Sequence, residues 1–164
     1  MNGNLLTLVE EIPKYNKGAI IVVEGSEQVI DNETYSSINR GYMILVGIDI
    51  NDTEEDVEKM VNKLIKFRIN PDENDKINLS IKDINGEILS ISQFTLLANA
   101  KKANRPGFEN AMKGEPAKHL YEYFNHLLEK EGITVKTGVF GADMKIHLIN
   151  DGPLTFTLDS KEDL

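Results

Sequence analysis

Short apolar runs of strand type dominate this chain and leave room for only two helices. The five clearest runs are at residues 19–23, 42–46, 87–92, 144–149 and 154–158. Runs of this length that are rich in Val, Ile and Leu are typical of buried strands. Turn signals separate them, namely Asn85-Gly86 before the third run, Gly141, and the sequence Asn-Asp-Gly-Pro at 150–153. We also expect a weaker first strand at residues 2–17, interrupted by Pro13.

Two further segments have the apolar period of a helix. The first begins at Asp52-Thr53, which supplies an N-cap, and has an acidic first turn at residues 54–56. The second is predicted to begin near Pro116 and to end at Gly132. The apolar faces that we assign to the core are Val57, Met60, Val61, Leu64 and Phe67 or Arg68 in the first helix, and Leu120, Tyr121, Phe124, Leu127 and Leu128 in the second. Strands with two helices set between them predict an α+β fold with a strongly curved sheet.

Length and composition restrict the architecture further. The 164 residues fit a single domain spanning residues 1–164, without a repeat or a linker. The chain has no cysteine, which excludes disulfides, cysteine-based zinc sites and thiol nucleophiles. It contains no apolar run of about 18 residues and no basic start of the signal-peptide type. We therefore expect a cytoplasmic protein with no membrane partner.

The charge of the chain limits how it could bind nucleic acid. A net charge of −9 argues against a protein that coats nucleic acid through bulk electrostatics. A local basic cluster could still hold one RNA end, and the tightest such cluster is Lys101, Lys102 and Arg105. The simpler interpretation of the same residues is a solvated surface loop.

The histidines give no sign of a metal site or a catalytic base. His119 and His126 lie seven residues apart on one side of the second helix, which predicts surface positions, and His147 falls within a strand. The chain has no Gly-x-Ser-x-Gly elbow, no Walker loop and no dinucleotide fingerprint. If the chain is an enzyme, we expect it to work without a metal, without a cofactor and without a histidine base.

Two short segments stand out. Ser-Gln-Phe-Thr-Leu at residues 92–96 closes an apolar strand, where successive backbone amides could donate to an anionic oxygen. The alternative is a strand end capped by its own polar side chains. Asn-Asp-Gly-Pro-Leu-Thr follows at residues 150–155 and, taken alone, predicts no more than a turn.

Together the two segments resemble the paired signature of the D-aminoacyl-tRNA deacylases. Further matches to that family lie at residues 41–48, 67–69, 76–80, 104–108 and 140–144. The resemblance covers roughly residues 19–158. It implies a dimeric D-tyrosyl-tRNA deacylase-like fold, in which a curved, β-barrel-like sheet carries two main helices.

The resemblance also implies a homodimer with its active site at the subunit interface, where the 3′ aminoacyl adenosine of a charged tRNA binds. The catalytic segment is expected to line the substrate pocket and to supply backbone amides, and it consists of Ser92, Gln93, Phe94 and Thr95. Phe140 and Met144 are expected to contact the substrate. Gly152 and Pro153 would reach across from the partner subunit and, as a cis pair, refuse an L side chain while D residues and glycine enter.

The implied reaction is hydrolysis of the ester bond of D-aminoacyl-tRNA, and of glycyl-tRNA. The ester is already activated, and the ribose 2′-hydroxyl or a water can attack it, so positioning and oxyanion stabilisation suffice. A covalent role for the Thr95 hydroxyl ranks second, because the sequence offers no adjacent base to activate it.

The chain departs from the family pattern near its start. The family's first strand ends in Gln-Arg-Val, whose arginine helps to hold the Gly-Pro loop, whereas residues 10–16 here contain no such triplet and offer only Lys14. Residues 24–40 are also longer than the expected hairpin. Two alternatives stay open: a non-catalytic nucleic-acid-binding member of the same fold, and a relative that removes mischarged L-amino acids, which would require a trans Gly-Pro bond.

Overall fold

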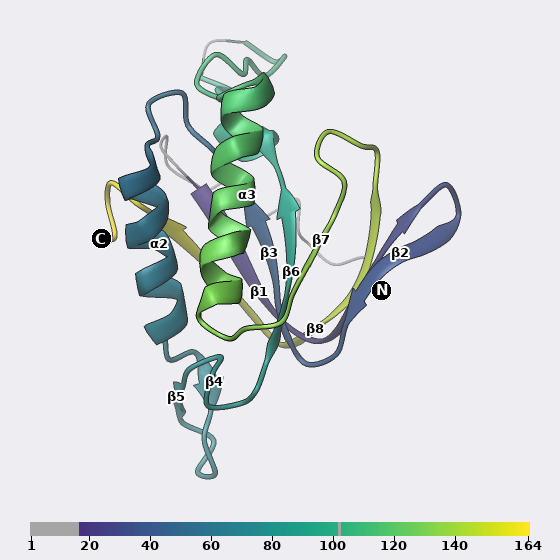
Figure 1. Cartoon of the computed structure of the whole chain (residues 1–164), viewed down its shortest axis with the longest axis vertical. Helices are drawn as coiled ribbons and strands as arrows, with labels where there is room; N and C mark the ends of the chain where they lie inside the picture. Colours follow the sequence, from purple (N-terminus) through teal and green to yellow (C-terminus); the bar gives the residue numbers. More distant parts are fainter. Residues whose placement is uncertain (1–16, 102) are drawn as a thin grey trace.

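The computed structural model describes residues 17–101 and 103–164, and its elements alternate between strands and two long helices (Figure 1). In chain order they are β1 (Lys17–Ile30), β2 (Glu33–Ile38), β3 (Gly41–Val46), α2 (Glu54–Lys66), β4 (Asn70–Pro71), β5 (Ile77–Leu79), β6 (Glu87–Ser92), the 3₁₀ turn η1 (Phe94–Leu97), α3 (Gly114–Lys130), β7 (Val135–Thr137) and β8 (Lys145–Asp159). The α+β class and the predicted third strand at 87–92 are confirmed.

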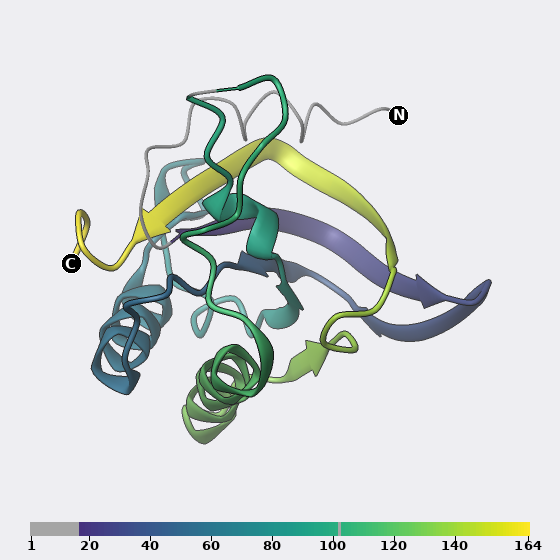
Figure 2. The same ribbon diagram turned by 90° about the horizontal axis from the view of Figure 1, so that it is seen from above.

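The main sheet is built around the long strand β1. Its strand order is β2-β1-β3-β6-β7, and β8 pairs with β1 along nearly its whole length. The first half of β1 pairs with β3 and the second half pairs with β2, so the strand bends where its neighbour changes. The β1–β8 register shifts between Ile21 and Gly25, at the same bend. The sheet is therefore strongly curved, as predicted (Figure 2).

The sheet curves far enough to bring its two end strands together without closing into a barrel. The Ser36 hydroxyl on β2 donates to the Thr137 carbonyl at the end of β7, at 3.0 Å. No β2–β7 backbone ladder joins these strands in the described part of the chain. The sheet is therefore curved like a barrel wall, as expected, but it is not closed. The hydrogen bond from Ser36 to Thr137 lies where a closed barrel would have a backbone-paired strand.

Both helices lie on the same side of the sheet (Figure 2). The predicted start of α2 is confirmed, since the Thr53 amide and hydroxyl both donate to the Asp56 carboxylate, at 3.0 and 2.9 Å. α3 begins at Gly114, two residues before the predicted Pro116, and its chain leaves the helix through Gly132 at a positive φ of 82°. No helix among the described residues is long and apolar enough to cross a bilayer.

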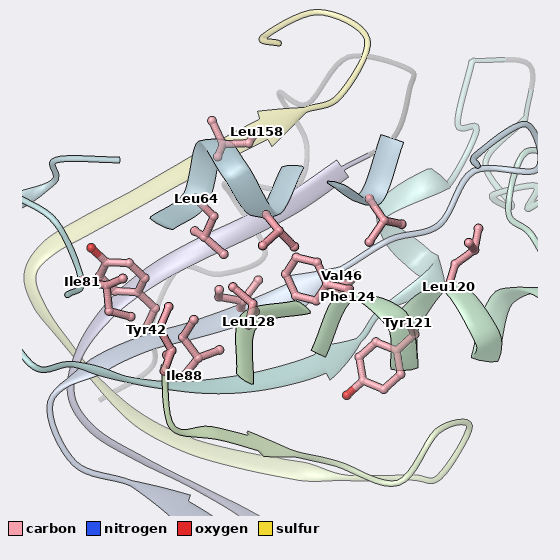
Figure 3. Packing of buried hydrophobic residues seen from close by; sticks show 14 of the residues in the cluster. Tyr42, Val46, Leu64, Ile81, Ile88, Leu120, Tyr121, Phe124, Leu128 and Leu158 are labelled. Atoms are coloured by element: carbon pink, nitrogen blue, oxygen red, sulfur yellow. The ribbon is translucent and has the colours of Figure 1, made fainter. Parts of the chain in front are cut away.

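The core fills the space between the helices and the sheet (Figure 3). Its buried members are Tyr42, Ile44, Val46, Val57, Val61, Leu64, Ile69, Ile81, Ile88, Leu120, Tyr121, Phe124, Leu128, Ile133 and Leu158. The alternate residues of the central strands, Met43, Leu45, Leu89 and Ile91, pack into a second cluster on the opposite face. β3 and β6 are therefore buried on both faces, which is why they read as continuous apolar runs.

One expectation about the strands is wrong. The segment 150–153 is not a turn between two strands, because it lies within the single strand β8. The Asn150 side chain accepts a hydrogen bond from the Leu154 amide at 2.9 Å and bridges the irregular stretch locally. Residues 24–40, which are longer than the hairpin that the family resemblance implies, contain the hairpin of β1 and β2, which turns at Asp31 and Asn32, both at positive φ. The weak strand predicted at residues 2–17 lies, apart from Lys17, outside the described residues, as does Lys14.

Candidate active site

A cavity of about 490 Å³ opens where β3 and β6 end. Its wall comes from four separate stretches of the chain: Val46 and Ile48; Ile91, Ser92, Gln93 and Phe94; Met112, Lys113, Gly114 and Ala117; and Phe140, Gly141, Ala142, Asp143, Met144 and Ile146. The structure therefore brings Ser92, Gln93 and Phe94 together with Phe140 and Met144, about fifty residues further along the chain.

The turn after β6 borders this cavity through Gln93 and Phe94. The Gln93 amide is engaged, because it donates to the Val46 carbonyl at 2.8 Å. The 3₁₀ turn η1 starts at Phe94, and Leu96 is the first residue whose amide bonds back to the turn, at 3.3 Å from the Gln93 carbonyl. The amides of Phe94 and Thr95 thus belong to the group that a helical turn leaves without an internal acceptor. They are the two amides of the segment best suited to an anionic oxygen.

Among the described residues, the hydrogen-bond partner of the Thr95 hydroxyl is an amide and not a base. It accepts a hydrogen bond from the side-chain amide of Gln93, and an amide nitrogen does not take up a proton. Thr95 is half-buried and is not among the residues that line the cavity. Activation of a threonine as a nucleophile requires an adjacent general base, and the Gln93 amide does not supply one.

An aromatic pair stands at the mouth of the cavity. The Phe94 ring is 56% exposed although it is large and apolar. It packs edge-to-face against Phe108, with the ring centroids 5.0 Å apart. Such a pair offers a flat apolar surface on which a base or an aromatic amino-acid side chain can stack.

The opposite wall is supported from α3. The Phe140 ring lies 5.9 Å from the Tyr121 ring, centroid to centroid. The Tyr121 hydroxyl donates to the Ser90 carbonyl at 2.7 Å, and burial raises the pKa of Tyr121 above its usual value. Tyr121 therefore stays a neutral hydrogen-bond donor and holds Phe140 against the sheet.

The first turn of α3 was not anticipated as part of the site. Met112, Lys113, Gly114 and Ala117 line the cavity, so a lysine and the positive end of a 17-residue helix both border it. Long-range contacts place them there: the Met112 amide donates to the Ile48 carbonyl at 2.9 Å, and Ala111 forms a bridge with Asp49. No local pattern signals such a contact, because it joins residues more than sixty positions apart.

The Gly152–Pro153 pair lies away from this cavity. Both residues are exposed on β8, and neither belongs to the cavity wall of their own chain. The Gly152–Pro153 peptide bond is cis, as the resemblance implies. The Asn150 side chain spans the segment, accepting from the Leu154 amide and donating to the Thr155 hydroxyl, both at 2.9 Å.

The remaining candidate residues are on the surface. Lys101 and Arg105 are exposed in the loop between η1 and α3, whose sides are joined by the Asn99–Gly107 bridge, and Lys102 lies outside the described residues. The predicted surface positions of His119 and His126 are confirmed. Within the described ranges, no three histidine or carboxylate side chains gather as metal ligands would.

Comparisons with known proteins identify the family of the chain. The model of the family D-Tyr-tRNA(Tyr) deacylase matches residues 19–159. A D-aminoacyl-tRNA deacylase of Lactobacillus gasseri is 53% identical over 137 residues, covering 84% of this chain and 94% of the relative. One from Sulfurihydrogenibium sp. is 51% identical over 140 residues, covering 85% and 95%.

Two solved structures share the fold. A structure titled c-Myc DNA Unwinding Element Binding Protein superposes with a TM-score of 0.82 at 37% identity, over 87% of this chain and 97% of that one. A probable eukaryotic D-amino acid tRNA deacylase superposes with a TM-score of 0.75 at 18% identity, over 88% and 98%.

Proposed function

The chain belongs to the D-Tyr-tRNA(Tyr) deacylase family and is a hydrolase, and from that premise we propose that it cleaves D-aminoacyl-tRNA in the cavity described above. The observation that carries the proposal is the meeting of Ser92, Gln93 and Phe94 with Phe140 and Met144 in one cavity wall. Ser92, Gln93 and Phe94 belong to the first signature segment, and Phe140 and Met144 belong to the further family match at residues 140–144.

The chemistry needs little from side chains. Water adds to the carbonyl carbon of the aminoacyl ester, and the neighbouring ribose 2′-hydroxyl assists its deprotonation. The carbonyl oxygen becomes an oxyanion that accepts hydrogen bonds from the amides of Phe94 and Thr95. The bond to the ribose 3′-oxygen then breaks, the proton passes to that oxygen, and free amino acid and tRNA leave. Positioning of the ester against fixed amides supplies the acceleration.

The cavity also suits the end of a tRNA. Phe94 and Phe108 give the terminal base or the amino-acid side chain an aromatic surface, and Lys113 with the start of α3 offers positive potential for a phosphate. Lys101 and Arg105 would contact the neighbouring backbone. The net charge of −9 makes such local cations necessary, because the molecule as a whole repels RNA.

Chirality would be read by Gly152 and Pro153 of a second subunit. Both residues are exposed and absent from their own chain's cavity wall, so they are available to another copy. β8 pairs only with β1 in the described part of the chain, which leaves its other edge open to a partner. A rigid Gly-Pro segment beside the α-carbon would obstruct an L side chain and admit D residues and glycine. Glycyl-tRNA is therefore a second expected substrate.

Nucleic-acid binding without catalysis is a second candidate function. The observation that favours it is the 37% identity to a protein whose structure is titled as a DNA-unwinding-element binder. The acidic surface counts against it, since binding to a DNA backbone depends on many lysine and arginine contacts.

The test is deacylation of D-tyrosyl-tRNA and glycyl-tRNA by the purified chain in the presence of EDTA, with binding to single-stranded DNA measured in parallel. We expect catalytic turnover of both esters and no binding to DNA at physiological salt. Failure to release amino acid from either ester, together with tight DNA binding, would replace this proposal by the second candidate.

A further inference from the structure

A glutamine is buried completely near the end of β1. Gln28 has 0% of its surface exposed, which is rare for a residue with two polar groups. Its side-chain oxygen accepts a hydrogen bond from the Ser36 hydroxyl on β2, at 3.3 Å. Its side-chain nitrogen donates to the thioether sulfur of Met144. Buried polar groups in folded proteins are hydrogen-bonded, and this amide finds its partners in β2 on one side and in Met144 on the other.

One of those parts is the wall of the active-site cavity. Met144 lines the cavity just before β8 begins, whereas Gln28 does not line it. Methionine has three rotatable bonds and fills space adaptably, so an unrestrained Met144 would leave the wall poorly defined. The hydrogen bond from Gln28 holds the thioether in one place. Ser36 completes the link, because its single hydroxyl proton is shared between the Gln28 side-chain oxygen at 3.3 Å and the Thr137 carbonyl at 3.0 Å, just before the loop that leads to Met144.

A third residue, Gly138, packs closely against both Gln28 and Met144. A side-chain Cβ added at Gly138 would lie 2.7 Å from both the Gln28 side-chain nitrogen and the Met144 sulfur. That separation is too short for a non-bonded contact, so a side chain at this position would force the Gln28 amide and the Met144 sulfur, both at the ends of flexible side chains, to shift. The loop from Gly138 to Met144 therefore closes directly over the Gln28 amide.

We infer that Gln28 is a positioning residue, which fixes Met144 and so sets the shape of the cavity that receives the aminoacyl end of the substrate. The inference rests on the proposed function for its kinetic consequences, but not for its structural ones. Gln28 touches neither the cavity nor the reacting atoms, so its effect is on substrate fit rather than on the chemical step.

The first test compares Gln28→Leu with Asn70→Leu as a matched control. Asn70 is an equally buried amide, bonded to the Tyr42 hydroxyl and the Leu79 carbonyl and absent from the cavity wall. Both variants should lose stability. Only Gln28→Leu should raise KM for D-tyrosyl-tRNA, by about three- to ten-fold as expected for one hydrogen bond, with kcat little changed. Equal KM values in the two variants would show that Gln28 is merely structural.

A double-mutant cycle with Met144→Leu shows whether the effect passes through the sulfur. Leucine has no acceptor, so Gln28→Leu should raise KM much less in a Met144→Leu background than in wild type. Additive effects would contradict the inference.

Methyl NMR of Met144 gives a readout that does not depend on activity. The Met144 methyl should be rigid in wild type and mobile in Gln28→Leu, and an already mobile methyl in wild type would overturn the inference. If Gln28→Leu does not fold, Gly138→Ala displaces the same pair and should raise KM and mobilise the methyl likewise. A wild-type chain that is inactive on D-tyrosyl-tRNA but has a rigid Met144 methyl would refute the proposed function alone.

Discussion

Replacing Thr95 by alanine distinguishes the two mechanisms that the site could use. In the structure the Thr95 hydroxyl accepts one hydrogen bond, from the Gln93 side-chain amide, and no base is among its bonded partners. A neutral hydrogen bond of this kind contributes about 0.5–1.5 kcal/mol, so its loss should lower kcat/KM by about two- to twelve-fold. The backbone amides of Phe94 and Thr95 remain in the variant. Substantial turnover should therefore survive.

A covalent role for Thr95 makes a very different prediction. Removing a true nucleophile lowers kcat by several orders of magnitude, about 10⁴–10⁶-fold in serine hydrolases. The assay is single-turnover release of D-tyrosine from D-tyrosyl-tRNA with acid quenching, which also reveals any acyl-enzyme. Thr95→Ser is the matched control, because it keeps the hydroxyl. A folded Thr95→Ala variant with a thousand-fold loss, beside an active Thr95→Ser, would refute the backbone-amide mechanism.

Three further results are expected. Lys113→Ala should raise KM about three- to ten-fold and flatten the salt dependence of KM, because a cation at the cavity wall is lost; an unchanged salt dependence would remove Lys113 from the site. Burial raises the pKa of Asp52 to about 7, so the folded state binds the extra proton between about pH 4 and 7 and stability falls as pH rises through that window. Asp52→Asn should therefore raise the free energy of unfolding by about 1–2 kcal/mol at pH 8, after allowance for solvent screening, and by less at pH 4, whereas an equal gain at both pH values would contradict this assignment. Sedimentation should show a dimer at micromolar concentration, with well over about 1,000 Å² buried, and a stable monomer would exclude a gate supplied by a second subunit.

The parts of the fold that could be predicted from sequence are those whose cause is local. The start of α2 depends on Thr53 and Asp56, three residues apart, and the apolar run of β6 reflects burial on both faces. β2 was missed because its residues are mostly exposed and polar, although the two-residue turn at Asp31-Asn32 is a signal that could have revealed the hairpin. β8 was predicted as two strands because Gly152 and Pro153 are turn residues. The structure continues the strand through them with hydrogen bonds that join the Asn150 side chain to Leu154 and Thr155.

The residues of the site also fall into those that the sequence could predict and those that it could not. The resemblance named Ser92, Phe140 and Met144, and the structure places all three in one cavity wall. Lys113 and Gln28 could not be found by spacing, because each reaches the site through contacts between distant segments. The Met112–Ile48 hydrogen bond brings the first to the cavity, and the packing of the loop after Gly138 over β1 brings the second beside Met144.

The most direct test of stereospecific hydrolysis is the ratio of D-tyrosyl-tRNA to L-tyrosyl-tRNA deacylation rates, in wild type and in Pro153→Ala. The pyrrolidine ring of Pro153 restricts its backbone, so alanine loosens the proposed obstacle while the cavity wall of the same chain stays intact. We predict fast hydrolysis of the D ester and protection of the L ester by wild type, and a smaller D-over-L ratio in the variant. Equal rates on the two esters by wild type, or a ratio unchanged in Pro153→Ala, would contradict the account.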